Sequence, residues 1–334
     1  MSSVQELAVT ARSLINDREY EQALQLLTPQ LETQDLALLQ LAAEAHLEIS
    51  SLAETQDDVA HAQQAYALFQ AAATKDDKSG SKGGFEKFLW LGQLSGGREA
   101  VKWFRRGCDG IKRELSESQA SDRTRVLNKK LSGALCSTIE VWMTDLCMED
   151  EAERMCDALI AEAMMVDSDS PENNAALASI RISQQRPDDA ADAVRRAWEL
   201  QVQAASDETD EVAEISSLKT LIKLALELSM FDVAEAACQR VIQLDDQIAE
   251  VYYLAGINYM QQQPRTRDSL TSAYECLTNA IELIKKSTDG VDDPEQLLKE
   301  MQSMVVQIEE MMSKDTIEDP ANEDDEWLDV LDDE

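Results

Sequence analysis

Apolar residues recur at intervals of three and four along most of the chain. In one example, Ala65, Phe69 and Ala72 place a small, a large and a second small side chain on one face of a helix. Ala, Leu, Glu and Gln are abundant, whereas runs that alternate aromatic or β-branched residues with polar ones are nearly absent. The pattern therefore predicts an all-α protein.

The same small–large–small rhythm occurs seven times. A small residue lets two antiparallel helices approach closely, and a larger one a turn later fills the space between them. This arrangement is typical of the second helix of a tetratricopeptide (TPR) hairpin. The small residues that anchor the seven predicted second helices are Ala23, Ala65, Ala100, Ala152, Ala190, Ala234 and Ala273.

Successive anchors are 35 to 52 residues apart, whereas an ideal TPR period is about 34 residues. The extra residues must lengthen helices and loops, notably around 50–58, 109–124, 201–211 and 262–268. We therefore predict a TPR-like right-handed superhelical solenoid of about seven irregular helical hairpins.

The end of the chain differs from the repeats. Pro294 suits the first turn of a helix, and Asp292 or Asp293 suits its cap. An apolar stripe from Leu297 to Ile308 follows, so we predict a C-terminal capping helix over 294–313. The predicted solenoid domain thus covers 1–313, and we expect 314–334 to be an acidic, disordered tail, because it is too charged to fold alone.

A glycine pair in LGQLSGGREA raises the possibility of a phosphate-binding loop. Such a loop needs four residues between its glycines, followed by Lys and then Ser or Thr, and this segment lacks that spacing. Phe88, Leu91 and Gly92 instead fit the packing face of a first repeat helix. We therefore interpret residues 95–97 as a tight turn in which glycine permits a positive φ.

Charge narrows the classes of partner. The chain carries 66 acidic and 30 basic residues, for a net charge of −36, so we expect it to bind neither nucleic acid nor membranes and to attract basic proteins. Residues 75–130 are the exception, with 8 acidic and 14 basic residues. We see no signal peptide or apolar run long enough to span a bilayer, and six cysteines without a CxxC pair suggest core residues of a soluble, intracellular protein.

Catalytic patterns are absent from the sequence. The two histidines, His46 and His61, have no metal-ligand spacing to cysteines or carboxylates, and no nucleophile motif occurs. We therefore predict that the chain is not an enzyme and has no catalytic, cofactor-binding or metal-binding residues.

The segment FLWLGQLSGGREAVKWFRRG in the third hairpin and the terminal EDDEWLDVLDDE together resemble the fungal assembly chaperones of ribosomal protein L-four. The resemblance implies a dedicated chaperone that holds a long, basic extension of the newly made ribosomal protein until it joins the large subunit. It also implies action in the cytoplasm and the nucleus. We expect a monomer that forms a 1:1 complex with this client.

The client-binding residues are predicted from the TPR register, in which first helices face the concave side. An acidic loop at 206–214 and the tail add further candidates, whereas two lysines at 219 and 223 conflict with a purely anionic groove. Either the register is wrong, or much of the acid lies on edges and loops. The candidates are Asp145, Glu172, Glu208, Asp210, Glu211, Glu214, Glu250, Tyr253, Ile257, Met260, Asp324, Asp325, Glu326 and Trp327.

A generic TPR adaptor is the alternative function. An adaptor that clamps an acidic peptide needs Lys, Asn and Arg on successive concave helices, and the early first helices supply only Arg12. The charge of the preferred ligand distinguishes the two hypotheses, because the chaperone should bind a basic peptide and the adaptor an acidic one.

The basic section at 75–130 is either a solvated face or a surface that recognises acidic tails or a nuclear transport receptor.

Overall fold

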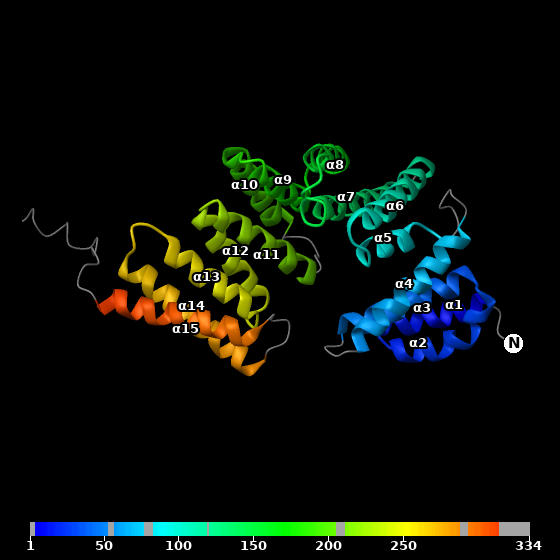
Figure 1. Cartoon of the computed structure of the whole chain (residues 1–334), viewed down its shortest axis with the longest axis horizontal. Helices are drawn as coiled ribbons and strands as arrows, with labels where there is room; N and C mark the ends of the chain where they lie inside the picture. Colours follow the sequence, from blue (N-terminus) through cyan, green and yellow to red (C-terminus); the bar gives the residue numbers. More distant parts are fainter. Residues whose placement is uncertain are drawn as a thin grey trace, which may run out of the picture. The chain divides into compact units, whose positions relative to one another are not determined.

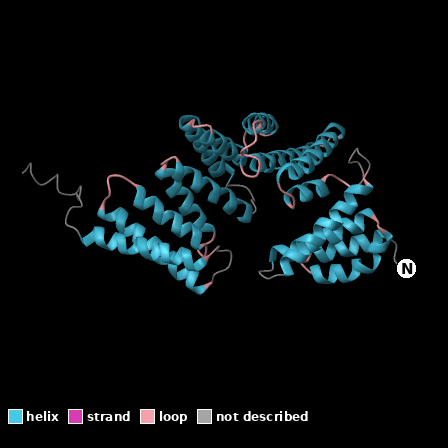
Figure 2. Cartoon of the chain, in the orientation of Figure 1, coloured by secondary structure: helices cyan, strands magenta, loops and turns pink. Residues whose placement is uncertain are grey.

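The computed structural model describes residues 4–52, 57–76, 83–118, 120–204, 211–287 and 293–313. In this part of the chain the regular elements are fifteen α-helices and one short 3-10 helix, and no strand is present (Figures 1 and 2). The helices form seven successive hairpins followed by a single helix. The predicted all-α class and the predicted number of hairpins are therefore confirmed.

The helices fall into two compact units. The first, Met1–Asp169, holds four hairpins. Its helices are α1 (Val4–Asn16), α2 (Tyr20–Leu27), the 3-10 helix η1 (Thr28–Thr33), α3 (Leu36–Leu52), α4 (Asp57–Lys75), α5 (Glu86–Gln93), α6 (Gly97–Glu117), α7 (Ser121–Met143) and α8 (Ala152–Val166).

The second unit, Ser170–Glu334, holds three hairpins and the final helix. Its helices are α9 (Pro171–Ser183), α10 (Pro187–Ala204), α11 (Glu211–Glu227), α12 (Phe231–Leu244), α13 (Ala249–Gln261), α14 (Arg267–Lys286) and α15 (Pro294–Ser313). The predicted boundary between a domain at 1–313 and a tail at 314–334 stays a prediction, because the tail lies outside the described residues.

The predicted anchors form the centre of each hairpin. Six of the seven have no exposed surface, and Ala152 is 8% exposed. Glycines on two first helices allow the same close approach: a Cβ at Gly92 would lie 2.7 Å from the Phe104 ring, and one at Gly256 would lie 2.7 Å from Leu277. Small residues at these positions are therefore a requirement of hairpin packing.

The glycine pair forms the predicted turn between α5 and α6. Gly97 has a φ of +54°, which favours glycine, and Gly96 is extended at the N-cap of α6. The extra residues around 109–124 mainly lengthen helices, since α6 has 21 residues and α7 has 23.

The predicted capping helix is α15. Asp293 caps it, because its Oδ1 accepts a hydrogen bond from the backbone N–H of Gln296 at 3.2 Å. Met301 and Ile308 are fully buried against α14, and the rest of the predicted stripe packs around them. Across the described ranges, no helix has both the length and the apolar character that crossing a bilayer would need.

Candidate functional site

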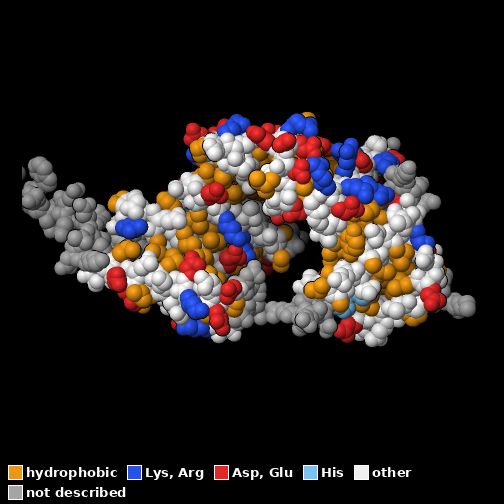
Figure 3. Space-filling view, viewed as in Figure 1, with side chains coloured by type: hydrophobic (Ala, Val, Ile, Leu, Met, Phe, Trp, Pro, Cys, Tyr) orange, Lys and Arg blue, Asp and Glu red, His pale blue; other side chains and the backbone are white. Residues whose placement is uncertain are grey.

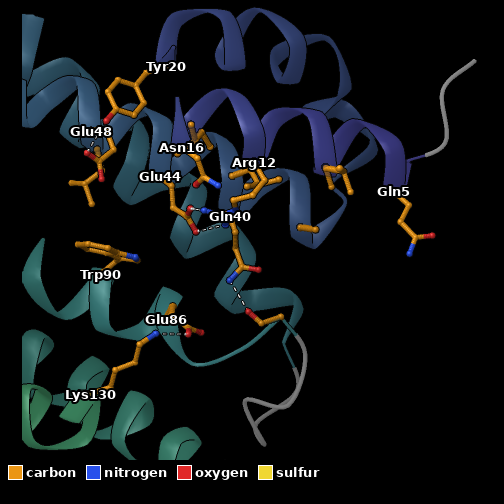
Figure 4. Close-up of a pocket in the computed structure, with 17 residues that line it drawn as sticks. Gln5, Arg12, Asn16, Tyr20, Gln40, Glu44, Glu48, Glu86, Trp90 and Lys130 are labelled. Atoms are coloured by element: carbon orange, nitrogen blue, oxygen red, sulfur yellow. Dashed lines mark hydrogen bonds and ion pairs between the residues drawn. The ribbon is translucent and has the colours of Figure 1, made fainter. Parts of the chain in front are cut away.

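A groove of about 910 Å³ opens on the first helices of the first unit (Figure 4). We call it the N-terminal groove. Residues of α1, α3, α5 and α7 line it, together with Gly83 and Tyr20. Its polar and aromatic lining consists of Gln5, Arg12, Asn16, Tyr20, Gln40, Glu44, Glu48, Glu86, Trp90 and Lys130.

Helical periodicity places the acids of α3 in this groove. Gln40, Glu44 and Glu48 are four residues apart and therefore lie on one face of the helix. The opposite face of α3 is apolar and buries Leu38, Ala42 and other residues against the neighbouring helices. Burial of the apolar face fixes the rotation of α3, and the acidic face is directed into the groove.

Each groove carboxylate has one partner within the unit. Arg12 donates to both oxygens of Glu44, with Nη1 2.5 Å from Oε2 and Nη2 3.2 Å from Oε1. Glu48 accepts a hydrogen bond from the Tyr20 hydroxyl at 3.4 Å. Glu86 pairs with Lys130 at 3.0 Å. A carboxylate has about four acceptor sites, so all three can bind a further Lys or Arg.

Trp90 supplies an aromatic surface between these charges. Its ring stacks on Phe69 with 6.4 Å between centroids, which fixes its orientation. A second hollow of about 310 Å³ shares Glu86, Trp90 and Lys130 with the groove and reaches Gly133 of α7. The site therefore combines three carboxylates, the cations Arg12 and Lys130, and apolar surface, and an extended peptide with basic and apolar side chains can use the carboxylates and the apolar surface.

Two candidates predicted from the sequence are exposed near helix N-termini. Asp145 accepts a hydrogen bond through Oδ2 from the backbone N–H of Gly97 at 2.6 Å and so stabilises the start of α6. Glu172 lies in the first turn of α9 and accepts a hydrogen bond from the Ser170 hydroxyl at 2.8 Å.

Glu250 on α13 is the partner of Lys219 and Lys223, the two lysines that conflicted with a purely anionic groove. Its carboxylate pairs with Lys219 and, at 2.7 Å, with Lys223, both on α11. Burial alone would raise the pKa of Glu250, but the hydrogen bonds and charges of the two lysines outweigh burial and hold that pKa below its ordinary value. Both lysines thus have a carboxylate partner within the second unit, although one carboxylate offsets only one of their two charges.

Tyr253 and Met260 pack against the apolar cluster that α14 and α15 build, and Ile257 is half-buried on the same helix. The Tyr253 hydroxyl donates to Glu300 of α15 at 2.8 Å. Burial and the neighbouring Glu300 carboxylate raise the pKa of Tyr253 to about 12. These residues therefore hold the capping helix in place.

The acidic loop is only partly described. Glu211 is exposed at the start of α11, whereas Glu214 is 5% exposed and pairs with Arg240 at 2.8 Å. The remaining candidates, Glu208, Asp210, Asp324, Asp325, Glu326 and Trp327, lie outside the described residues. A role for any of the predicted candidates in binding a client stays a prediction.

Sequence reasoning missed the main lining of the N-terminal groove. None of the predicted candidates lines this groove. The spacing of Gln40, Glu44 and Glu48 within the 36–49 segment, which is otherwise apolar except for His46, was the available signal. Trp90 was not among the predicted candidates.

Metal-ligand clusters are absent from the described part of the chain, where no three His, Cys, Asp or Glu side chains come together in a way that could hold a metal ion. The only two histidines, His46 and His61, contact each other through Nδ1 atoms 2.9 Å apart.

Two curated proteins resemble the chain, and both are named "Probable assembly chaperone of rpl4". The one from Schizosaccharomyces pombe is 31% identical over 215 residues, which make up 64% of this chain and 63% of the relative. The one from Emericella nidulans is 34% identical over 248 residues, or 71% of this chain and 57% of the relative. The matches thus span less than two thirds of either relative.

A solved structure of "Assembly Chaperone of RpL4 (Acl4) (Residues 1-338)" superposes with a TM-score of 0.67 and 30% identity. The match covers 78% of this chain and 96% of the solved chain. No protein-family model matches the chain.

Proposed function

We propose a function for this chain from one premise: the chain belongs to the family of assembly chaperones of RpL4. By this proposal it is a dedicated chaperone of a ribosomal protein of the RpL4 type. It binds the newly made protein and shields a long basic extension or internal loop until incorporation into the large ribosomal subunit. The likeness to Acl4 over nearly the whole solved chain is the observation that carries the proposal.

Charge supports this role. A basic extension without its own core is prone to aggregation and to binding other polyanions, and a chain with a net charge of −36 attracts it. Each exposed ion pair contributes only about 0–1 kcal/mol, so tight binding requires many pairs along an extended surface. The expected complex is therefore sensitive to salt.

The N-terminal groove is the part of the first unit that we assign to the client. Lys or Arg side chains of the client would pair with Glu44, Glu48 and Glu86 around its rim. A further cation or an apolar side chain would lie on the face of Trp90. The acids of 206–214, the α13 candidates and the tail are proposed as further contacts.

The proposal extends to the setting of the complex. We assign the chain a binding role without catalysis, as a monomer in a 1:1 complex, in the cytoplasm and the nucleus. A nuclear transport receptor is a further proposed partner. The proposed mechanism includes no energy source. We therefore propose that ribosomal RNA or assembly factors release the client by competing for it.

Calorimetric titration with the isolated basic loop of RpL4, at several salt concentrations, tests the proposal. Tight 1:1 binding that weakens with salt, and that a scrambled loop of the same composition does not reproduce, is the expected result. Equal binding of both peptides would reduce the effect to generic attraction by a polyanion. Binding of an acidic peptide in place of the basic loop would favour the generic TPR adaptor.

A further inference from the structure

One helix of this acidic protein presents a basic face. Its residues are spaced so that they cover roughly a third of the circumference of α6, and Figure 3 shows blue side chains gathered over α6 and α7. We call it the α6 basic face. It consists of Arg98, Lys102, Arg105, Arg106, Lys112 and Arg113, and its one interspersed acid is Asp109.

Half of these cations are neutralised within the first unit. Arg98 pairs with Glu149 and Glu151 at 2.8 and 3.0 Å. Lys102 pairs with Glu99 at 3.4 Å, and Lys112 pairs with Glu162 at 2.6 Å. These pairs give Arg98, Lys102 and Lys112 a role in the fold.

The other three cations differ. Arg105, Arg106 and Arg113 form no ion pair with a carboxylate of the described residues. All three lie within about two turns of helix, and Arg105 is exposed. Asp109 lies four residues from both Arg105 and Arg113, so one carboxylate is interspersed among three arginines and the cluster keeps a net positive charge.

Aromatic rings hold one of these arginines in position. The Arg106 guanidinium lies 4.1 Å from the centroid of the Phe88 ring and 5.2 Å from that of Trp103. The two rings stack with 6.1 Å between centroids, and the Lys102 ammonium lies 5.3 Å from the Trp103 ring. Packing on rings restricts a guanidinium while leaving its N–H donors available, and its planar fork suits bidentate binding of a carboxylate.

Trp103, on which Arg106 and Lys102 pack, carries an unsatisfied hydrogen-bond donor. Its side chain is 6% exposed, and its Nε1–H has no hydrogen-bond partner in the described structure. A buried indole N–H normally finds an acceptor. Because this Nε1 atom is buried, an outside acceptor reaches it only when neighbouring side chains move, so the proposal is carried by the three arginines.

We propose that the α6 basic face docks an acidic segment of a partner protein. The α6 basic face is positively charged, like the basic client proposed above, so its partner must be a second, acidic protein. A long polyphosphate such as RNA would meet the strongly negative remainder of the chain. A short run of Asp and Glu can match three arginines without extending into that field.

Fluorescence anisotropy with a fluorescein-labelled oligoglutamate peptide tests the proposal on the full chain. Arg105→Glu combined with Arg113→Glu should weaken binding by about tenfold or more, while leaving Arg106 on its rings. The matched control is Arg195→Glu with Arg196→Glu on α10, which changes net charge equally and should have less than about a twofold effect. The α6 variant should still bind the basic RpL4 loop, which separates this surface from the client site.

Three outcomes would overturn the proposal. Equal losses in both variants would mean that only net charge matters. Preferential binding of oligouridylate RNA, lost in the α6 variant, would assign the surface to nucleic acid. A rise in peptide affinity after removal of residues 314–334 would assign it to the acidic end of this chain.

Discussion

The ammonium of Lys87 lies 2.7 Å from a carboxylate oxygen of Asp76, and neither side chain has any exposed surface. Asp76 follows α4 and Lys87 lies in α5, so the pair joins the second hairpin to the third. Lys87 also donates to the carbonyl of Gly84. Burial lowers the pKa of Lys87, and the hydrogen bond and charge of Asp76 oppose that shift.

Asp76→Ala should destabilise the protein by about 3–5 kcal/mol, because it leaves the buried Lys87 charge without its main partner. Urea unfolding followed by far-UV circular dichroism measures the loss. Adding Lys87→Met to the same chain should recover much of it, since no buried charge then remains. Glu99→Gln, which removes only the exposed pair with Lys102, should cost about 0–1 kcal/mol. A loss of that smaller size in Asp76→Ala would refute this account.

The same substitution, glycine to alanine, should have opposite effects on stability at Gly92 and at Gly133. Gly92→Ala should destabilise the protein by about 1–3 kcal/mol, because its Cβ would overlap the Phe104 ring across the α5–α6 hairpin. Gly133→Ala in α7 meets no atom within 4 Å and should stabilise its helix by about 0.5–1 kcal/mol. Thermal unfolding of both variants checks the pair. A Gly92→Ala protein as stable as the parent would mean that the hairpin packs less closely than described.

Much of the fold was predictable because the packing of two helices in a hairpin requires small and large residues at fixed spacings along the local sequence. Ala65 and Ala273 are fully buried as their spacing predicted, and α15 starts at the predicted Pro294. The partners of the charged residues were not predictable. Glu250 meets Lys219, which is 31 residues earlier in the sequence and on another helix, and periodicity within a helix carries no information about such a pairing. The spacing of Gln40, Glu44 and Glu48 could have indicated one side of the N-terminal groove, but not the opposite side, where Glu86 and Lys130 come from other helices.

The Glu250 pair predicts a pH dependence of stability. The folded pKa of Glu250 is below its ordinary value of 4.5, so its stabilising effect is complete above that value and is lost as pH falls through the folded pKa. The difference in unfolding free energy between the parent and Glu250→Gln should therefore be constant near neutral pH and shrink in acid. Because the side chain is 36% exposed, we expect a difference of about 0–1 kcal/mol. A difference that grows in acid would contradict the assignment.

Cysteine reactivity should differ sharply between sites. Burial raises the pKa of the Cys108 and Cys238 thiols to about 12, and that of Cys156 and Cys276 to about 11. Thiolates are the reactive species, so these four should react slowly with Ellman's reagent in the folded protein. Cys147 is exposed and should give the fast phase, which Cys147→Ser removes. A fast phase that persists in that variant would show that another thiol, either the half-buried Cys136 or one of the other four, is accessible.

The acids of the N-terminal groove should contribute directly to binding of a basic client. Glu44→Gln combined with Glu48→Gln removes two negative charges and frees Arg12, which repels a client lysine or arginine. Affinity for the RpL4 loop should fall by about tenfold, as expected for one or two ion pairs.

The salt dependence of this binding should become shallower in the same variant, because fewer ion pairs form. Glu275→Gln with Glu282→Gln on α14 changes the charge equally on two exposed residues outside the groove, and should leave both quantities nearly unchanged. Calorimetry at several salt concentrations compares the two variants. If the α14 variant lost as much affinity as the groove variant, the client would be responding to total charge, and the groove would have no special role in holding it.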